Sequence, residues 1–443
     1  MKEINRKFLK YVTLNVLSML GYSAYILADT YFIANGVGEN GLVALNLCLP
    51  VYSVVIGTGV LLGMGASTRF SMALGAKEEE KLTPIFMQAV MFGASAGLIL
   101  LAAGLLFPEP VARLFGASGE TMELSAVYLR TVLFFAPLFI VENILVCFVR
   151  NDGNPRLAMA AMLVSSMSNI LLDYLFVFPL QMGMFGAALA TGFSPGIGLL
   201  ILSAHFRKGK NRFHLCRCRF LKGELRHIAA AGLPPFITEL SGGAVILVFN
   251  LVILRLEGNT GVGAYGIISN IALVCIGMIN GVSQGVQPLI SRSHGAGEPE
   301  KAGGYYIRAC LFVFLLGSAI YAAGFFFSEP IVAAFNREGS LPLLALAKRG
   351  IRLYFTAFFL LGFNVITANF FACVSRPKPA FLLSLLRGFL LVIPLALLLP
   401  IFWKMDGVWL AVPVSELLTA LLGACFIRIY QKNSKKFKKG FDF

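Results

Sequence analysis

The sequence predicts an all-α polytopic membrane protein, with twelve transmembrane helices in two six-helix lobes related by a pseudo-twofold axis along the membrane normal. Three observations lead to this fold class. The 443 residues are 58% hydrophobic and 13% charged, with a mean hydropathy of +0.80, whereas soluble domains are roughly 45–50% apolar. Apolar stretches of about 20 residues, long enough to cross a bilayer as helices, recur from end to end. Segments of the two halves also repeat each other.

Each predicted helix is an apolar stretch bounded by charged, glycine-rich or proline-containing residues. The first follows a basic start of the chain and is long enough to span the bilayer, so no cleavable signal peptide is expected. None of the stretches alternates in hydropathy as the strands of a membrane barrel do. The twelve helices are predicted over 8–34, 44–69, 85–107, 128–149, 157–179, 184–205, 228–254, 264–290, 305–327, 351–374, 380–400 and 407–430.

Three separated loop segments of the first half recur 220 residues later. Gly41–Ala44 matches Gly261–Ala264, Gly75–Lys81 matches Gly295–Lys301, and Phe107–Val111 matches Phe327–Ile331. Six helices return a chain to its starting side, so the halves share one orientation and the ligand path is expected between them. The predicted organisation is an N-terminal lobe (1–205), a basic cytoplasmic linker (206–227), a C-terminal lobe (228–430) and a basic cytoplasmic tail (431–443).

The formal net charge of +15 does not indicate nucleic-acid binding, because excess Lys and Arg mark the cytoplasmic loops of membrane proteins. Basic residues gather at the N-terminus, in the linker and in the tail, which predicts a plasma-membrane protein with both termini in the cytoplasm. One group disagrees with this rule, since Lys348, Arg349 and Arg352 fall on the predicted outer side. The bilayer is the expected partner, and the chain is expected to act as a monomer.

Two aspartates lie within predicted helices, Asp29 in the first and Asp173 in the fifth. A carboxylate in the bilayer core costs at least ~2.5–3.5 kcal/mol and is typical of sites that bind or relay a cation. Counting about 1.5 Å of rise per residue places both, with Thr191, at similar depth near the outer surface. Asn169 lies one turn from Asp173 on the same helix face. These four residues predict a proton or sodium site, although interhelical hydrogen bonding alone would also explain Asn169 and Thr191.

Four other charged residues lie inside predicted helices. Glu239 and Glu416 come near the midplane of the second lobe, where they form either a second cation or substrate site or a structural network. Glu142 and Arg387 lie nearer the cytoplasmic side, and a structural or gating role is expected for both.

No enzyme signature stands in a suitable place. All four histidines lie in loops or at span ends, and Cys216 and Cys218 form a lone C-x-C pair, a weak metal signal. No metal site and no cofactor are predicted. Without a nucleotide-binding domain, uphill transport must use an ion gradient.

The chain resembles the multidrug and toxic compound extrusion (MATE) family of secondary transporters over nearly its whole length. The resemblance is carried by Asp29–Gly36, Leu74–Lys77, Asn151–Arg156, Ser168–Asp173, Gly186–Thr191, Gly232–Pro234, Gln284–Pro288 and His294–Gly297. It implies two six-helix lobes around a central cleft and drug efflux coupled to inward flow of H⁺ or Na⁺. It also implies a cation site at Asp29, Asn169, Asp173 and Thr191, and an acidic function at Glu239. The family's aspartate in helix ten is missing here, as is the proline of helix one.

The leading hypothesis is therefore a secondary antiporter that exports amphipathic, often cationic, organic compounds by alternating access between two lobes. A lipid-linked oligosaccharide flippase of related fold is the first alternative, although Arg387 is the one clear intramembrane cation in the sequence reading. A membrane-embedded lipid enzyme is the second, but its nucleophile or metal cluster is not found.

Overall fold

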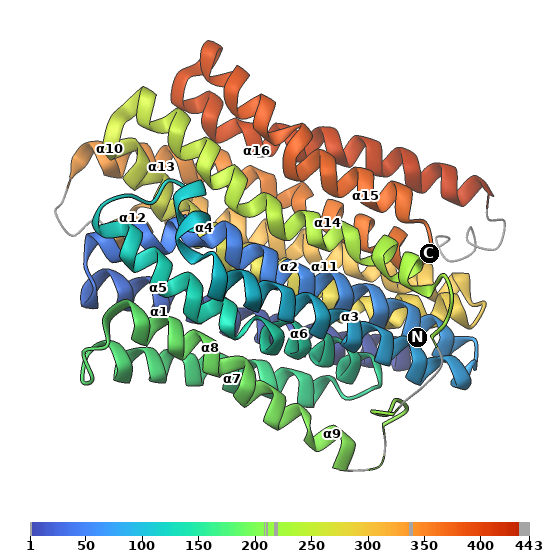
Figure 1. Ribbon diagram of the computed structural model, residues 1–443. Helices are drawn as coiled ribbons and strands as arrows, with labels where there is room; N and C mark the ends of the chain where they lie inside the picture. Colours follow the sequence, from blue (N-terminus) through green and yellow to red (C-terminus); the bar gives the residue numbers. More distant parts are fainter. Residues whose placement is uncertain (1, 208, 210, 217–219, 336–339, 434–443) are drawn as a thin grey trace. The chain divides into compact units, whose positions relative to one another are not determined.

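The computed structural model describes residues 2–207, 209, 211–216, 220–335 and 340–433, and all regular elements within these ranges are helical (Figure 1). The predicted all-α membrane fold is thereby confirmed. The elements are α1 (Lys2–Gly36), α2 (Glu39–Gly75), α3 (Glu79–Leu106), α4 (Pro108–Leu114), α5 (Glu120–Phe134), α6 (Ala136–Asn151), α7 (Pro155–Val177), α8 (Gly183–Leu202), α9 (Ala204–Arg207), α10 (Glu224–Gly295), α11 (Pro299–Phe326), α12 (Ser328–Phe335), α13 (Leu341–Tyr354), η1 (Phe355–Ala357), α14 (Phe358–Cys373), α15 (Pro377–Leu385), η2 (Leu386–Leu390) and α16 (Val392–Asn433).

Within these described ranges, nine helices are long and apolar enough to cross a membrane, or ten when α5 and α6, bent by 49°, count as one span. Two of the nine contain a break in helical backbone. Gly258 has φ 60° inside α10, and Trp403 and Lys404 leave helical geometry inside α16. When α10 and α16 are each divided at these breaks, the helices are consistent with the twelve predicted spans.

Helix boundaries repeat with the spacing seen in the sequence. α3 (Glu79–Leu106) and α11 (Pro299–Phe326) begin and end 220 residues apart. Gly38, which precedes α2, has φ 94°, and Gly258, 220 residues later, has φ 60°. A positive φ is readily adopted by glycine alone, so both halves use a glycine to interrupt the chain at the same place. The repeated loops are therefore repeated helix ends.

The chain divides into two compact units. The N-terminal unit comprises Thr13–Leu240 and Gly295–Gly297, and the C-terminal unit comprises Met1–Val12, Ser241–His294 and Glu298–Phe443. The division falls inside α1 and α10, so each of these helices contributes residues to both units.

In the N-terminal unit, α7 and α8 lie side by side (Figure 1). α7 begins where the Asn154 side chain accepts a hydrogen bond from Leu157 N at 3.3 Å and Pro155 occupies the first turn, a favourable helix start. Elsewhere in this unit α2 and α10 approach so closely that neither Gly65 nor Gly232 has room for a Cβ atom. Small residues allow such close packing of membrane helices.

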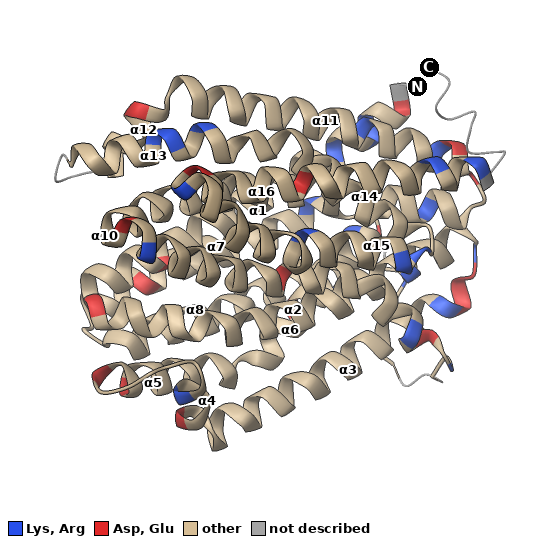
Figure 2. Ribbon diagram, turned by 90° about the horizontal axis from the view of Figure 1, so that it is seen from above, with Lys and Arg blue, Asp and Glu red and all other residues tan. Residues whose placement is uncertain are grey.

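Figure 2 shows the charged residues gathered toward helix ends, with few along the middle sections. The three basic residues that disagree with the charge rule have local partners in the C-terminal unit. Lys348 Nζ lies 2.6 Å from Glu329 Oε2, Arg349 pairs with Asp406, and the Arg352 guanidinium lies 4.8 Å from the centre of the Phe325 ring. Each of the three therefore has an acidic or aromatic neighbour within the C-terminal unit.

The described part of the predicted linker (206–227) packs onto the N-terminal unit. Phe213 is fully buried against the phenylalanine rings of α2, α3 and α6, and stacks on His205. Asp152 Oδ2 accepts a hydrogen bond from Arg212 N at 3.0 Å and lies 2.9 Å from His205 Nε2. Lys208, Lys210, Arg217, Cys218 and Arg219 lie outside the described residues, as does the tail from residue 434 onward.

We expect Asp152→Ala to release this segment, because buried His205 and the Arg212 amide lose their acceptor. The expected loss in the free energy of unfolding is about 1–3 kcal/mol, with faster tryptic cleavage between residues 206 and 227. Glu78→Ala is the control, since the side chains of its pair with Lys81 are 43% and 40% exposed and such pairs contribute about 0–1 kcal/mol. Cleavage at the wild-type rate would show that Asp152 does not hold the segment.

Candidate functional site

The first helix packs closely on α7 because small residues of α1 face it. A Cβ at Gly21 would lie 2.6 Å from Leu163 Cδ2, and Gly36 leaves no space beside Val177. The Phe32 ring also contacts Phe178, with ring centres 5.9 Å apart. Asp29 lies between these contacts along α1, so the packing places it beside the outer part of α7.

Asp29 and Asp173 are both buried, with exposed fractions of 8% and 0%. Their carboxyl groups are close enough to interact electrostatically. Asp29 Oδ1 and both carboxyl oxygens of Asp173 have no hydrogen-bond partner, and neither residue joins an ion pair with another described residue. Buried acceptors without partners are costly, and a bound proton or small cation would remove that cost.

Asn169 and Thr191 complete the predicted group of four. Asn169 Nδ2 donates to Thr191 Oγ1 at 3.4 Å, and Thr191 Oγ1 donates to Ala187 O at 3.0 Å. Asn169 Oδ1 is buried without a partner. Asn169 and Thr191 therefore make the hydrogen bonds expected of a structural role. The carboxylate oxygens of the two aspartates and the amide oxygen of Asn169 nevertheless remain available to bind a cation. Oxygens of this kind are the ligands that hard cations prefer.

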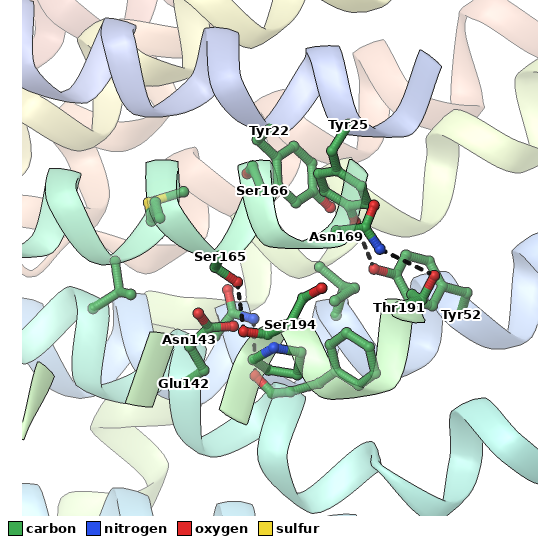
Figure 3. Close-up of a pocket in the computed structure, with 15 residues that line it drawn as sticks. Tyr22, Tyr25, Tyr52, Glu142, Asn143, Ser165, Ser166, Asn169, Thr191 and Ser194 are labelled. Carbon is green, nitrogen blue, oxygen red and sulfur yellow. Dashed lines mark hydrogen bonds between the residues drawn. The ribbon is translucent and has the colours of Figure 1, made fainter. Parts of the chain in front are cut away.

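A cavity of about 70 Å³, lined by both polar and apolar side chains, opens beside Asn169 and Thr191 (Figure 3). It lies entirely within the N-terminal unit, between α1, α2, α6, α7 and α8. Its polar lining residues are Tyr22, Tyr25, Tyr52, Glu142, Asn143, Ser165, Ser166, Asn169, Thr191 and Ser194. A cavity of this size with several polar side chains in its wall holds a few water molecules.

Glu142 lines this cavity, and its carboxyl group fills the space beside Gly198 of α8. Glu239 lies in the same unit, where both carboxyl groups act electrostatically on the hydroxyls of Tyr22 and Tyr52. The structure therefore brings Glu239 and Glu142 to one group of tyrosines, a grouping that the sequence does not indicate.

Glu416 and Arg387 form a buried ion pair in the C-terminal unit, with Arg387 Nη2 lying 3.0 Å from Glu416 Oε1. Asn364 Nδ2 donates to Glu416 Oε2 at 2.6 Å, and Asn364 Oδ1 is buried without a partner. Arg387 lies in the π-helical turn η2, which Leu391 N closes by donating to Leu386 O at 2.9 Å. Counting residues along the predicted helices placed Arg387 and Glu416 at different depths in the membrane. In the structure their side chains form an ion pair.

Arg150 is a buried cation that the sequence reading missed. It lies at the end of α6 with an exposed fraction of 0%, and its Nη1 donates to Asn15 Oδ1 at 2.7 Å. The predicted helix 128–149 ended one residue before it, whereas α6 continues to Asn151. The sequence carried one sign of a buried partner for Arg150, because Asn15 is a polar residue within the first apolar stretch. No cluster of three metal-ligating side chains occurs among the described residues.

Comparisons with known proteins agree with this architecture. The family model described as MatE matches residues 15–175 and 236–398. The multidrug export protein MepA of Staphylococcus aureus (strain MSSA476) is 27% identical over 400 residues, covering 90% of this chain and 87% of that protein. MepA of Staphylococcus saprophyticus is 26% identical with the same coverage.

Two solved structures share the fold over nearly the whole chain. An outward-facing multidrug resistance MATE family transporter of the MOP superfamily has a TM-score of 0.92 at 23% identity, with 98% of this chain and 97% of that chain covered. A MOP superfamily transporter from Pyrococcus furiosus, described as having reversed binding-pocket polarity, has a TM-score of 0.90 at 23% identity and covers 97% of each chain.

Proposed function

We propose, from the premise that this chain belongs to the MatE family of membrane transporters, that it is a cation-coupled antiporter for amphipathic organic compounds. The family resemblance seen in the sequence is confirmed. The chain is a multi-pass membrane transporter and not an enzyme, in agreement with the sequence prediction. The coupling ion, the substrates and the transport cycle are proposals.

The observation that carries the proposal is the pair of buried aspartates without hydrogen-bond or ion-pair partners. Three of their four carboxyl oxygens and Asn169 Oδ1 are unpaired and buried. H⁺ or Na⁺ would satisfy these oxygens, and both are transported ions in this proposal rather than cofactors. The cation-loaded and cation-free forms would then favour different arrangements of α1 against α7, as a ligand does when it binds one state better.

The proposed substrates are small, amphipathic and often cationic organic molecules, because the related MepA proteins are multidrug exporters. In the proposed cycle, the two lobes alternate access across the plasma membrane, with both termini in the cytoplasm. Glu239 and Glu416 remain candidates for a second cation or substrate site, and Glu142 and Arg387 for gating.

Ion-driven export from proteoliposomes tests this function. Purified protein is reconstituted with a fluorescent organic cation inside, and an inward H⁺ or Na⁺ gradient is imposed, each alone. The wild type is expected to accelerate dye loss at least about fivefold under one of the two gradients, the lower end of typical coupling factors. Equal dye loss with and without both gradients would contradict antiport.

The flippase alternative expects several cations in the central cavity. Arg387 instead pairs with Glu416 in the C-terminal unit, which does not favour this reading. Transfer of a lipid-linked sugar between the leaflets of the same proteoliposomes would be the result that restores it.

A further inference from the structure

The cavity of the N-terminal unit, whose wall is partly polar and partly apolar, has a feature that the proposed cation site does not require. Glu142 adds a third carboxyl group, and it lies at the opposite side of the cavity from Asn169 and Thr191 (Figure 3). On α7, Ser165, Asn169 and Asp173 follow one another at four-residue spacing, which places them on one helix face. Ser165 to Asp173 spans about 12 Å at 1.5 Å per residue. The aspartate pair does not line the cavity, but Asp173 lies one turn from Asn169 and two turns from Ser165 on the same face of α7.

The cavity wall presents hydrogen-bond acceptors. Ser165 Oγ donates to Ser194 O at 2.8 Å, Ser194 Oγ donates to Ala190 O at 2.8 Å, and Thr191 Oγ1 donates to Ala187 O. Because the Ser165 and Ser194 hydroxyl protons are committed to backbone carbonyls, lone pairs of these two oxygens are left for other groups, whereas Thr191 Oγ1 already accepts from Asn169 Nδ2. Asn169 Oδ1, with the residue 99% buried, has no partner. An acceptor-rich wall with a carboxylate favours a small hydrated cation.

The groups around Glu142 come from α7, α8, α1, α2 and α10. Ser165 of α7 lies within hydrogen-bond reach of the Glu142 carboxyl group. Gly198 of α8 touches the Glu142 carboxyl group, and the Tyr22 and Tyr52 hydroxyls of α1 and α2 lie within its electrostatic range, together with Glu239 of α10. On its own helix, buried Arg150 lies eight residues, about 12 Å, toward the Asn151 end. A positive charge at that distance in a low-dielectric environment opposes further movement of a cation along α6.

We propose that this cavity is a transit chamber for the coupling cation and that Glu142 is its inner binding group. A small monovalent cation, hydronium or Na⁺, enters at Asp29 and Asp173, passes Asn169 and Thr191, and is held by Glu142 before release. The positive charge of Arg150 opposes movement of the cation beyond Glu142. The cation is therefore released when the helices rearrange and does not leak past Arg150. This inference rests on the proposed cation-coupled function and adds a second cation-binding position to it.

The experiment compares two transport modes in Glu142→Gln proteoliposomes. Ion-driven dye export is measured under H⁺ or Na⁺ gradients separately, and substrate exchange is measured with equal substrate on both sides and no gradient. We expect ion-driven export to fall at least tenfold while exchange stays within twofold of wild type. Glu123→Gln is the matched control, because Glu123 is an exposed carboxylate of α5 in the same unit, and it should leave both modes unchanged.

The possible outcomes distinguish failure of the Glu142 inference from failure of the proposed antiport function. If the wild type shows no ion-driven export, the antiport proposal itself fails. If the wild type is ion-driven and Glu142→Gln keeps that export, the transit chamber is overturned alone. Should Glu142→Gln fail to fold, Glu142→Asp decides, since the inference predicts an altered dependence on pH or on Na⁺ concentration, and an unaltered dependence overturns it.

Discussion

Replacing Asp173 by asparagine is expected to abolish ion-driven export while leaving the protein inserted and folded. Asp173 is fully buried and neither of its carboxyl oxygens has a hydrogen-bond partner, so the substitution removes a cation ligand without breaking a contact. The effect of the gradient on export should fall by on the order of 100-fold, toward the upper end of known coupling factors. The measurement is dye export with and without the driving gradient.

Asp152→Asn is the matched control for this experiment, because Asp152 is a buried aspartate of the same unit whose carboxyl group does have partners. It should alter stability and leave the dependence on the ion gradient intact. Gradient-driven export at the wild-type rate in Asp173→Asn would remove Asp173 from the cation site.

Replacing Arg387 alone is expected to destabilise the C-terminal unit strongly. Arg387→Met leaves the Glu416 carboxylate buried beside Asn364 without its counter-charge. Loss of one partner from a buried ion pair costs about 3–5 kcal/mol. The free energy of unfolding, measured in detergent micelles, should fall by this amount. The double variant Arg387→Met/Glu416→Gln should return to within about 1 kcal/mol of wild type, since glutamine keeps the acceptor for Asn364.

The surface pair of Lys348 and Glu329 provides the comparison. Its side chains are 35% and 61% exposed, and exposed pairs contribute about 0–1 kcal/mol, so Lys348→Met should change stability little. If Arg387→Met were as mild as Lys348→Met, the Arg387–Glu416 pair would not stabilise the unit. A double variant as unstable as the single one would mean that the lost packing of Arg387, and not the buried charge, dominates.

Much of the fold could be predicted because long apolar stretches and loop repeats follow directly from chain composition. The 220-residue repeat correctly anticipated matched helix ends in α3 and α11. The short helices α4 and α12 were missed, since seven or eight residues carry too little periodicity to separate them from loops. The 49° bend between α5 and α6 lies next to Pro137, one of the prolines that can kink a predicted span.

The grouping of the candidate residues could be predicted where their depth along the helices and their helix face were sufficient. It could not be predicted where the length of a side chain or the packing of the helices determined a contact. Asp29, Asn169, Asp173 and Thr191 are buried in the same unit, as depth along their helices suggested. Depth counted along the backbone separated Arg387 from Glu416, because it ignores the length of an arginine side chain and the local π-helical turn. The entry of Glu142 into the cavity depends on the close contact with Gly198, which sequence does not reveal.

The central claim is that Asp29 and Asp173 exchange a small cation as substrate crosses the membrane. Because coupling is reciprocal, an outward substrate gradient alone should drive that cation inward. Proteoliposomes carrying an internal pH-sensitive dye and external radioactive sodium would report both ions in one experiment. The account predicts that substrate export moves one of the two ions inward in the wild type and neither in the Asp29→Asn/Asp173→Asn variant. Substrate export without movement of either ion in the wild type, or unchanged ion movement in the double variant, would contradict it.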